Sequence, residues 1–261
     1  MSMPVPITAE EKKSPLYKYF EMEMAKPSPE HYKQAETFLD PAKAHRAPDL
    51  NKLFDDGYMY GEIGYTQFED GTAMLANLVD MPGVTPEMFD WWFAWHGLEP
   101  LRYKIWCHDE HHEAITRNPE KARDTSLSMK ERYWDTIHDV KEAMTPDGPV
   151  LDITIHFRNP ADIGFDKEKL KDFKGTIVCS GNEHAPVIMV HFVRPTERGS
   201  ELRTRFWMGW GVRDGKPAKF LPDGAKIPVD GAKELLMHNV KEFTNLAAIL
   251  PKVYAEFKDA F

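Results

Sequence analysis

The sequence predicts an α+β protein in which an antiparallel sheet surrounds one long C-terminal helix. Four β-rich runs lie between residues 151 and 212, separated by Gly, Pro and charged turns, which is typical of an antiparallel meander. An amphipathic pattern extends from about Gly231 to Phe257 with helical spacing. A chain of 261 residues is long enough for one good-sized core with a small subdomain. These features predict a helix-grip (Bet v 1-like) arrangement, which encloses a cavity between sheet and helix.

The N-terminal residues 1–57 are polar and repeatedly interrupted by proline, with a short helical patch at 30–39. This segment has too few apolar positions to fold alone. It is therefore interpreted as an arm or small helical subdomain that lies on the helix-grip domain, residues 58–261, or on a partner subunit. The second arrangement would make the protein a homodimer.

From Tyr58 to residue 82, glycines and short alternating runs indicate strands and turns. Thr85 and Pro86 then provide an N-cap and a first helical residue, and the aromatic helix that they begin stops at Gly97. Residues 99–112 mix β-formers with histidines, which predicts a strand that runs into a loop.

Residues 118–131 indicate a polar loop or a short helix. The pattern of residues 133–142 fits a helix or a strand; the strand is preferred, and its period of two puts His138 and Glu142 on one face. The meander strands are expected at residues 151–157, 175–181, 186–193 and 201–212.

Charge and composition exclude several classes of protein. The net charge of −9 is spread along the chain, which argues against a nucleic-acid or an anionic membrane partner. No apolar run approaches the roughly 18 residues of a membrane span, and the N-terminus lacks a signal peptide, so a cytoplasmic protein is expected. Cys107 and Cys179 lie far apart, which leaves His and carboxylates as the ligands of any metal.

The sharpest local feature is His238 followed four residues later by Glu242. In a helix this spacing puts both side chains on one face, together with Leu235 and Leu246. The pair is therefore expected to point into the sheet, either as a structural hydrogen bond or as two ligands of one metal.

A second feature is the run of polar groups at residues 108–112, which contains three histidines and two acids. It offers several ligands to a borderline metal, or it forms a solvated loop. Cys107, next to this run, is interpreted as a buried thiol.

Residues from about Tyr58 to the C-terminus resemble the zinc-dependent carbon–carbon hydrolases of acylphloroglucinols, the family of 2,4-diacetylphloroglucinol hydrolase and phloretin hydrolase. The resemblance rests on the motifs WWFAWHGLEPLRYKIW, VKE, FWMG and HNVKE and on the histidine that follows the first of them. It implies a zinc ion bound by His111, Glu142, His238 and Glu242.

The resemblance also implies that Tyr103 contacts the substrate and that Tyr103, Glu142 and Glu242 take part in catalysis. The chain departs from the family pattern at Ala114, where the family has Asn. It also has no Tyr between Tyr133 and Tyr254, where the family has a second substrate contact. The substrate is thus expected to be an aromatic ketone with a substitution pattern different from that of diacetylphloroglucinol.

The remaining aromatic and histidine residues keep two interpretations. Tryptophans at four positions are candidates for pocket walls or for core packing, namely Trp91, Trp92, Trp95 and Trp207. His96, His108 and His112 are candidates for polar contacts or for structural roles. Two other functions stay open for the whole chain: a helix-grip protein that only binds an apolar ligand, and a non-haem metal enzyme of different chemistry such as Fe(II) oxygen chemistry.

Overall fold

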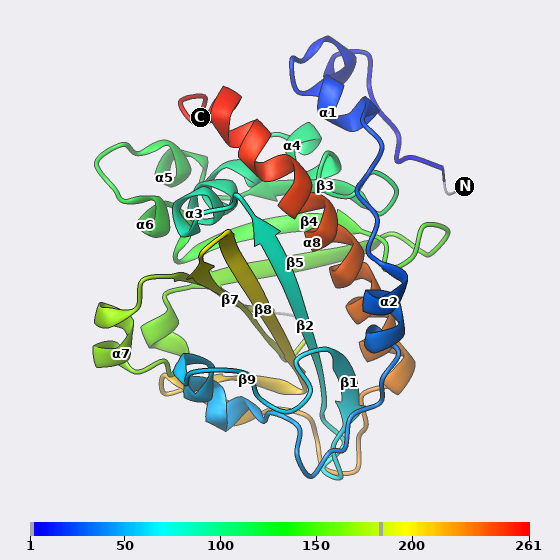
Figure 1. Ribbon diagram of the computed structural model, residues 1–261, viewed down its shortest axis with the longest axis vertical. Helices are drawn as coiled ribbons and strands as arrows, with labels where there is room; N and C mark the ends of the chain where they lie inside the picture. The colour runs from blue at the N-terminus through cyan, green and yellow to red at the C-terminus, as the bar shows by residue number, and fades with distance from the viewer. Residues whose placement is uncertain (1–2, 183–184) are drawn as a thin grey trace.

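An eight-stranded antiparallel sheet forms the body of the molecule (Figure 1). The computed structural model describes residues 3–182 and 185–261. Across those residues the strand order is β1-β2-β8-β7-β6-β5-β4-β3. The strands are β1 (Gly64–Gln67), β2 (Ala73–Pro82), β3 (His111–Thr116), β4 (Thr136–Glu142), β5 (Leu151–Arg158), β6 (Thr176–Asn182), β7 (Val187–Thr196) and β8 (Gly199–Met208).

The chain forms one edge of the sheet first and then crosses to the opposite edge. A hairpin of β1 and β2 forms one edge, and the chain then crosses to β3 at the other edge. The crossover contains α3 (Pro86–Trp95), η3 (His96–Leu98) and α4 (Pro100–Lys104). Each later strand pairs with the one before it, and β8 also pairs with β2, which joins the first hairpin to the rest of an open sheet.

The long helix α8 (Val229–Phe257) lies across the sheet and packs against β1, β2 and α3 (Figure 1). Its inner side chains recur every three or four residues, and Leu236, Val240 and Phe243 have no exposed surface. The predicted α+β class with an antiparallel sheet and a long C-terminal helix is therefore confirmed.

Most local predictions agree with the structure. The Thr85 side chain accepts a hydrogen bond from the backbone N–H of Met88 and begins α3 as expected. The strand preferred for the ambiguous segment is β4.

Two local predictions are wrong. Residues 99–112 begin with helix α4 because Pro100 supplies the fixed φ of a first helical residue, and the strand starts only at His111. The run at 201–212 is two strands, since Gly209 has a φ of +90° and turns the chain between them.

The smaller elements cover the ends and the outer face of the sheet. They are α5 (Pro119–Arg123), α6 (Met129–Tyr133), η4 (Pro160–Ile163), α7 (Lys167–Asp172) and a two-stranded sheet of β9 (Trp210–Arg213) and β10 (Lys216–Lys219). No helix in the described ranges is both long enough and apolar enough to cross a bilayer.

The N-terminal segment runs along the body through η1 (Glu11–Lys13), α1 (Tyr17–Glu21), α2 (Pro29–Ala35) and η2 (Ala47–Phe54). Leu16 and Tyr19 join the core between the sheet and α8, whereas Leu50 and Leu53 join a second core on the other face of the sheet. Residues 1 and 2 lie outside the described part, and a separate subdomain ending near residue 57 stays a prediction.

Candidate metal centre

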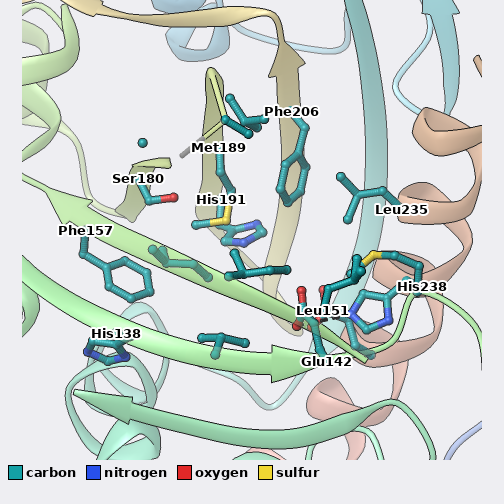
Figure 2. A pocket seen from close by; sticks show the side chains of 18 of the residues that line it. His138, Glu142, Leu151, Phe157, Ser180, Met189, His191, Phe206, Leu235 and His238 are labelled. Carbon is teal, nitrogen blue, oxygen red and sulfur yellow. Dashed lines mark ion pairs between the residues drawn. The ribbon is translucent and has the colours of Figure 1, made fainter. Parts of the chain in front are cut away.

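A cavity of about 420 Å³ lies between the inner face of the sheet and α8. Its size falls in the range of small-molecule sites. Side chains from β4 to β8 and from α8 form its wall (Figure 2). Most of them are apolar, with His138 and Ser180 toward one end, Glu142 and His238 at the other and His191 between them. The lining residues used below are Phe93, His96, Tyr103, His138, Glu142, Phe157, Ser180, Met189, His191, Phe206, Leu235, His238 and Glu242.

Strand pairing brings together two of the predicted ligands. His111 is the first residue of β3 and Glu142 is the last residue of β4, and the two are direct partners in the antiparallel register. The register shifts between His111 and Glu113, so that a bulge separates His111 from the rest of the ladder. The separation of 31 positions in sequence thus becomes a contact between neighbours.

The other two predicted ligands come from α8. His238 and Glu242 lie one helical turn apart on its buried face, with exposed fractions of 3% and 7%. Trp106 fixes this turn by donating its indole N–H to the Glu242 carbonyl over 3.0 Å. The sheet and the helix therefore contribute two side chains each to one site.

The donor atoms of these four side chains lie close together. His111 Nε2 is 3.3 Å from His238 Nε2, 3.5 Å from Glu242 Oε2 and 3.8 Å from Glu142 Oε2. His238 Nε2 is 3.9 Å from the same Glu142 oxygen. Figure 2 shows Glu142 and His238 pointing toward each other at one end of the cavity. We call His111, Glu142, His238 and Glu242 the metal cluster.

Each imidazole ring is oriented with its Nε2 toward the cluster and its Nδ1 toward an acceptor. His238 Nδ1 donates to Glu110 Oε2 over 2.7 Å, and His111 Nδ1 donates to the Tyr103 carbonyl over 3.3 Å. Lys241 Nζ, 2.8 Å from the other Glu110 oxygen, pairs the charge of that acid. A carboxylate or carbonyl behind the ring is the usual support of a metal-binding histidine.

The two carboxylates are oriented by hydrogen-bond donors. The Tyr103 hydroxyl donates to Glu142 Oε2, and its ring stacks on His111 with 3.8 Å between centroids. Asn239 Nδ2 donates to Glu242 Oε1 over 2.9 Å, which leaves Oε2 directed at the cluster.

Asn239 is itself held by Asn77, which is held in turn by His31. Its Oδ1 accepts from Asn77 Nδ2 on β2 over 2.9 Å, and Asn77 Oδ1 lies 2.8 Å from His31 Nε2 on α2. His31, Asn77 and Asn239 thus form a polar relay that runs from the surface to Glu242.

Because the cluster is buried, keeping its side chains charged without a compensating partner costs free energy. Burial raises the pKa of Glu242 to about 8, with Glu142 adding to the effect. Burial alone would lower the pKa of His238, but the hydrogen bond to Glu110 and the nearby carboxylates raise it to about 9. Burial and His238 hold the pKa of His111 well below its usual range. A divalent cation is the alternative to the protons that the cluster would otherwise hold.

The donor set fits such a cation. Nitrogen and oxygen donors are the ligands of zinc and related metals, and separations of 3.3 to 3.9 Å suit atoms bound about 2.1 Å from one ion. His111, His238 and Glu242 also form one of the two groups with metal-ligand spacing among the residues described.

The second such group is Cys107, Asp109 and Glu110. Lys241 Nζ contacts both acids of this group, so its cation position is filled by an ammonium. Burial raises the pKa of the Cys107 thiol well above its usual range, as expected of a buried thiol. From residues 108–112, only His111 joins the metal cluster.

Of the two interpretations of the four tryptophans, core packing agrees with the structure and a place in the pocket wall does not, since none of the four is among the described residues that line the cavity. Trp91, Trp92 and Trp95 lie in the core beneath the C-terminus, where the first and third donate to the carbonyls of Lys258 and Ala260. Trp207 belongs to the core on the opposite face of the sheet. From α3 only Phe93 reaches the cavity, because the other faces of this helix pack on α8 and the chain end.

Of the three other candidate histidines, only His96 lines the cavity. His108 packs on the Phe20 ring, and His112 is half-buried outside the cavity lining. Sequence reasoning missed His138 and His191 as wall residues. The position of His138 could have been predicted, because the alternation of the strand at residues 133–142 puts His138 on the same face as Glu142.

Three comparisons with known proteins show what this chain is similar to. A family model described as "DAPG hydrolase PhiG domain" matches residues 45–255. The chain is 37% identical to phloretin hydrolase of Eubacterium ramulus, over 98% of this chain and 95% of that protein. It is 28% identical to 2,4-diacetylphloroglucinol hydrolase of Pseudomonas protegens, over 93% and 84%. A solved structure, that of Ara h 8.0201, aligns with a TM-score of 0.43 and 8% identity over 70% of this chain and 99% of that one.

Proposed function

The chain belongs to the DAPG hydrolase family, and from this premise we propose that it is a metal-dependent hydrolase of aromatic ketones. It cleaves the carbon–carbon bond between a polyhydroxylated ring and an acyl group and releases a carboxylic acid. The observation that carries the proposal is the metal cluster at one end of a largely apolar cavity. Zinc is the proposed metal, and an acylphloroglucinol or a phloretin-like ketone is the proposed substrate.

His111, Glu142, His238 and Glu242 would hold the metal. A divalent cation bound there supplies Lewis acidity, which polarises a carbonyl and makes water more acidic. Four protein ligands would close the coordination shell unless one of them yields a position. Glu142 suits that role, because its Oε2 already shares a hydrogen bond with Tyr103.

Tyr103 is the proposed proton donor to the substrate. Burial and the charge of Glu142 hold its pKa well above the usual range, so the phenol keeps its proton at neutral pH. When a substrate enters the cavity, the hydroxyl can turn from Glu142 to a ring oxygen or the ketone oxygen. A hydrogen bond there favours the keto tautomer of the ring and stabilises negative charge on oxygen.

The reaction follows from the chemistry of the polyhydroxylated ring. The ring carbon that bears the acyl group takes a proton as a ring hydroxyl becomes a ketone, which gives a 1,3-dicarbonyl arrangement. Water adds to the side-chain carbonyl, the carbon–carbon bond breaks, and its electron pair leaves as the ring enolate. Glu142 or Glu242 would accept the proton of the water, which is supported by the position of both carboxylates beside His111. The enolate regains a proton as the aromatic phenol, and the acyl group leaves as the acid.

Metal analysis and a substrate screen test the proposal together. We expect about one zinc per chain, and acid release from phloretin, monoacetylphloroglucinol or diacetylphloroglucinol. A substrate with both hydroxyls ortho to the acyl group methylated should bind without being cleaved, because it cannot tautomerise. If the zinc-loaded protein releases acid from none of the free polyphenols, the proposed reaction is wrong. Oxygen-dependent turnover would replace it with Fe(II) chemistry.

Two further expectations belong to this proposal. The polar N-terminal segment supports a homodimer, which light scattering after gel filtration would detect. A cytoplasmic location also stays a prediction, testable by fractionating the source cells.

A further inference from the structure

The end of the cavity remote from the metal cluster carries a buried histidine with an unmet hydrogen bond. His138 is 2% exposed and lines the cavity, and its Nδ1 has no partner among the residues that the structure describes. Its ring lies over Gly97, where a Cβ would come within 2.5 Å of it. Because buried polar groups are nearly always paired in native proteins, an unpaired imidazole in a cavity wall points to a ligand.

Other groups at this end match the same ligand chemistry. His96 lies beside His138 with 5.3 Å between ring centroids, and its Nδ1 donates to the Trp92 carbonyl, which leaves Nε2 as an acceptor. The Phe157 ring packs edge-on against His138 at 4.8 Å, and Ser180 also lines this end (Figure 2). An aromatic wall with donors and acceptors suits a phenolic hydroxyl, which both donates and accepts.

The length of the cavity decides which part of a substrate reaches this end. His138 and Glu142 lie four residues apart on the inner face of β4, which separates them by roughly 13 Å along the strand. Figure 2 shows them at opposite ends of the cavity. A single phloroglucinol ring with acetyl groups is shorter than this span. A ketone with a second ring at the end of its acyl chain has the required length.

We propose that His138, His96, Phe157 and Ser180 form a subsite for a hydroxyphenyl group at the far end of the substrate's acyl chain. The subsite rests on the proposed function, since it assumes that the ketone lies at the metal cluster. Burial and His96 hold the pKa of His138 well below its usual range, so the ring meets the hydroxyl as a neutral imidazole. His138 is then a specificity-determining residue that does not take part in bond cleavage.

A pair of substrates that differ in one hydroxyl tests the subsite. We would measure kcat/KM for phloretin and for its analogue in which the hydroxyl of the phenylpropanoyl ring is replaced by hydrogen. The wild-type enzyme should prefer phloretin by about 10- to 100-fold, the range for one lost buried hydrogen bond. His138→Phe should reduce this preference to less than about threefold without loss of metal, and His138→Gln should retain part of it.

His45→Phe is the matched control. His45 is equally buried and also has an unpaired Nδ1, but it lies against Trp207 outside the cavity lining. This variant should keep the full preference for phloretin. A wild-type preference near one, or an undiminished preference in folded His138→Phe, overturns the subsite.

Direct binding separates failure of the subsite from failure of the proposed reaction. If zinc-loaded wild type cleaves neither these two compounds nor the acetylphloroglucinols, the reaction is wrong. Calorimetric titration with phloretin and its analogue then tests the subsite alone. Binding of phloretin at least about tenfold tighter than its analogue, lost in His138→Phe, supports the subsite. Equal affinities for phloretin and its analogue would overturn the subsite and would mean that His138 pairs with ordered water instead.

Discussion

At the scale of single residues, the metal cluster depends on which atom of each side chain faces its centre. Glu110 and the Tyr103 carbonyl accept from the two Nδ1 atoms, so that both Nε2 atoms face the centre of the cluster. Without these partners, a neutral imidazole would turn or change tautomer and leave the donor set. The chemistry of the site is therefore shared between its ligands and the acceptors behind them.

His238→Ala is expected to abolish metal binding while the protein stays folded. The substitution removes one of two imidazole donors, and the remaining acids and His111 no longer surround the cation. Elemental analysis after dialysis would measure the metal, and circular dichroism would report folding. His45→Ala, at an equally buried site outside the cluster, should keep its metal. Full metal content in the His238→Ala protein would remove this residue from the ligand set.

Tyr103→Phe should lower turnover by roughly 10- to 1000-fold, as for the loss of one preorganised hydrogen bond to developing charge. The ring and its stacking on His111 are kept, so metal content and melting temperature should stay near wild type. Steady-state kinetics with a cleaved aryl ketone provides the measurement. Unchanged kcat and KM would contradict a role of the hydroxyl in the reaction.

At the scale of elements, the polar relay joins α2, β2 and α8 beneath the metal cluster. Asn77 and Asn239 have no exposed surface. Asn77 donates to Asn239, and Asn239 donates to Glu242, so the hydrogen bonds of the relay run in one direction. Aligned hydrogen bonds of this kind strengthen one another in a buried site. The relay thus ties the position of Glu242 to the packing of the helix on the sheet.

Asn77→Ala is expected to weaken zinc affinity by about 10- to 100-fold, the usual cost of losing an indirect support of a ligand. Asn239 loses the donor to its Oδ1 and is freer to turn away from Glu242. Competition with a chromogenic chelator would measure the affinity. The matched control is Asn245→Ala, since Asn245 is also buried on α8 but bonds the carbonyls of Ile105 and Trp106. Equal losses in both variants would mean that general destabilisation causes the effect.

At the scale of the whole molecule, buried neutral histidines are expected to make the fold sensitive to acid. Burial lowers the pKa of His45 and His96 to about 4 and that of His191 to about 3, compared with 6.5 in an unfolded chain. Between pH 6.5 and about 4 the unfolded state therefore binds more protons, and the free energy of unfolding falls as pH falls. Asp90 opposes this trend, because burial raises its pKa to about 6 and folding then favours its protonation.

Urea unfolding at pH 7 and pH 4.5 would measure this dependence. His108, with a pKa lowered to about 4, adds to the effect of the other three histidines, whereas Glu242, with a pKa raised to about 8, acts with Asp90 against it. The four histidines outnumber the two acids, so we expect stability at pH 4.5 to be lower by a few kcal/mol. His45→Phe should show a shallower fall, because it removes one proton-binding group from the unfolded state. Equal stability at the two pH values would contradict the neutral state of these histidines.

The fold class, most elements and the common helix face of His238 and Glu242 can be predicted from the sequence alone. Those features depend on local periodicity, as in the turn between His238 and Glu242, which a 3.6-residue repeat places on one face. His111 and Glu142 were assigned only through a family resemblance, because no local pattern sets the register between two strands.

Which aromatic and polar groups line the cavity depends on how distant elements pack together. The aromatic helix could bury any of its faces, and its packing on α8 turned the tryptophans into core and left Phe93 on the wall. The sequence also gives no indication of the supporting residues Glu110, Asn77 and Asn239, since each bonds or is held across a contact between distant elements. Long-range contacts of this kind follow from how faces pack together, which periodicity along one segment does not specify.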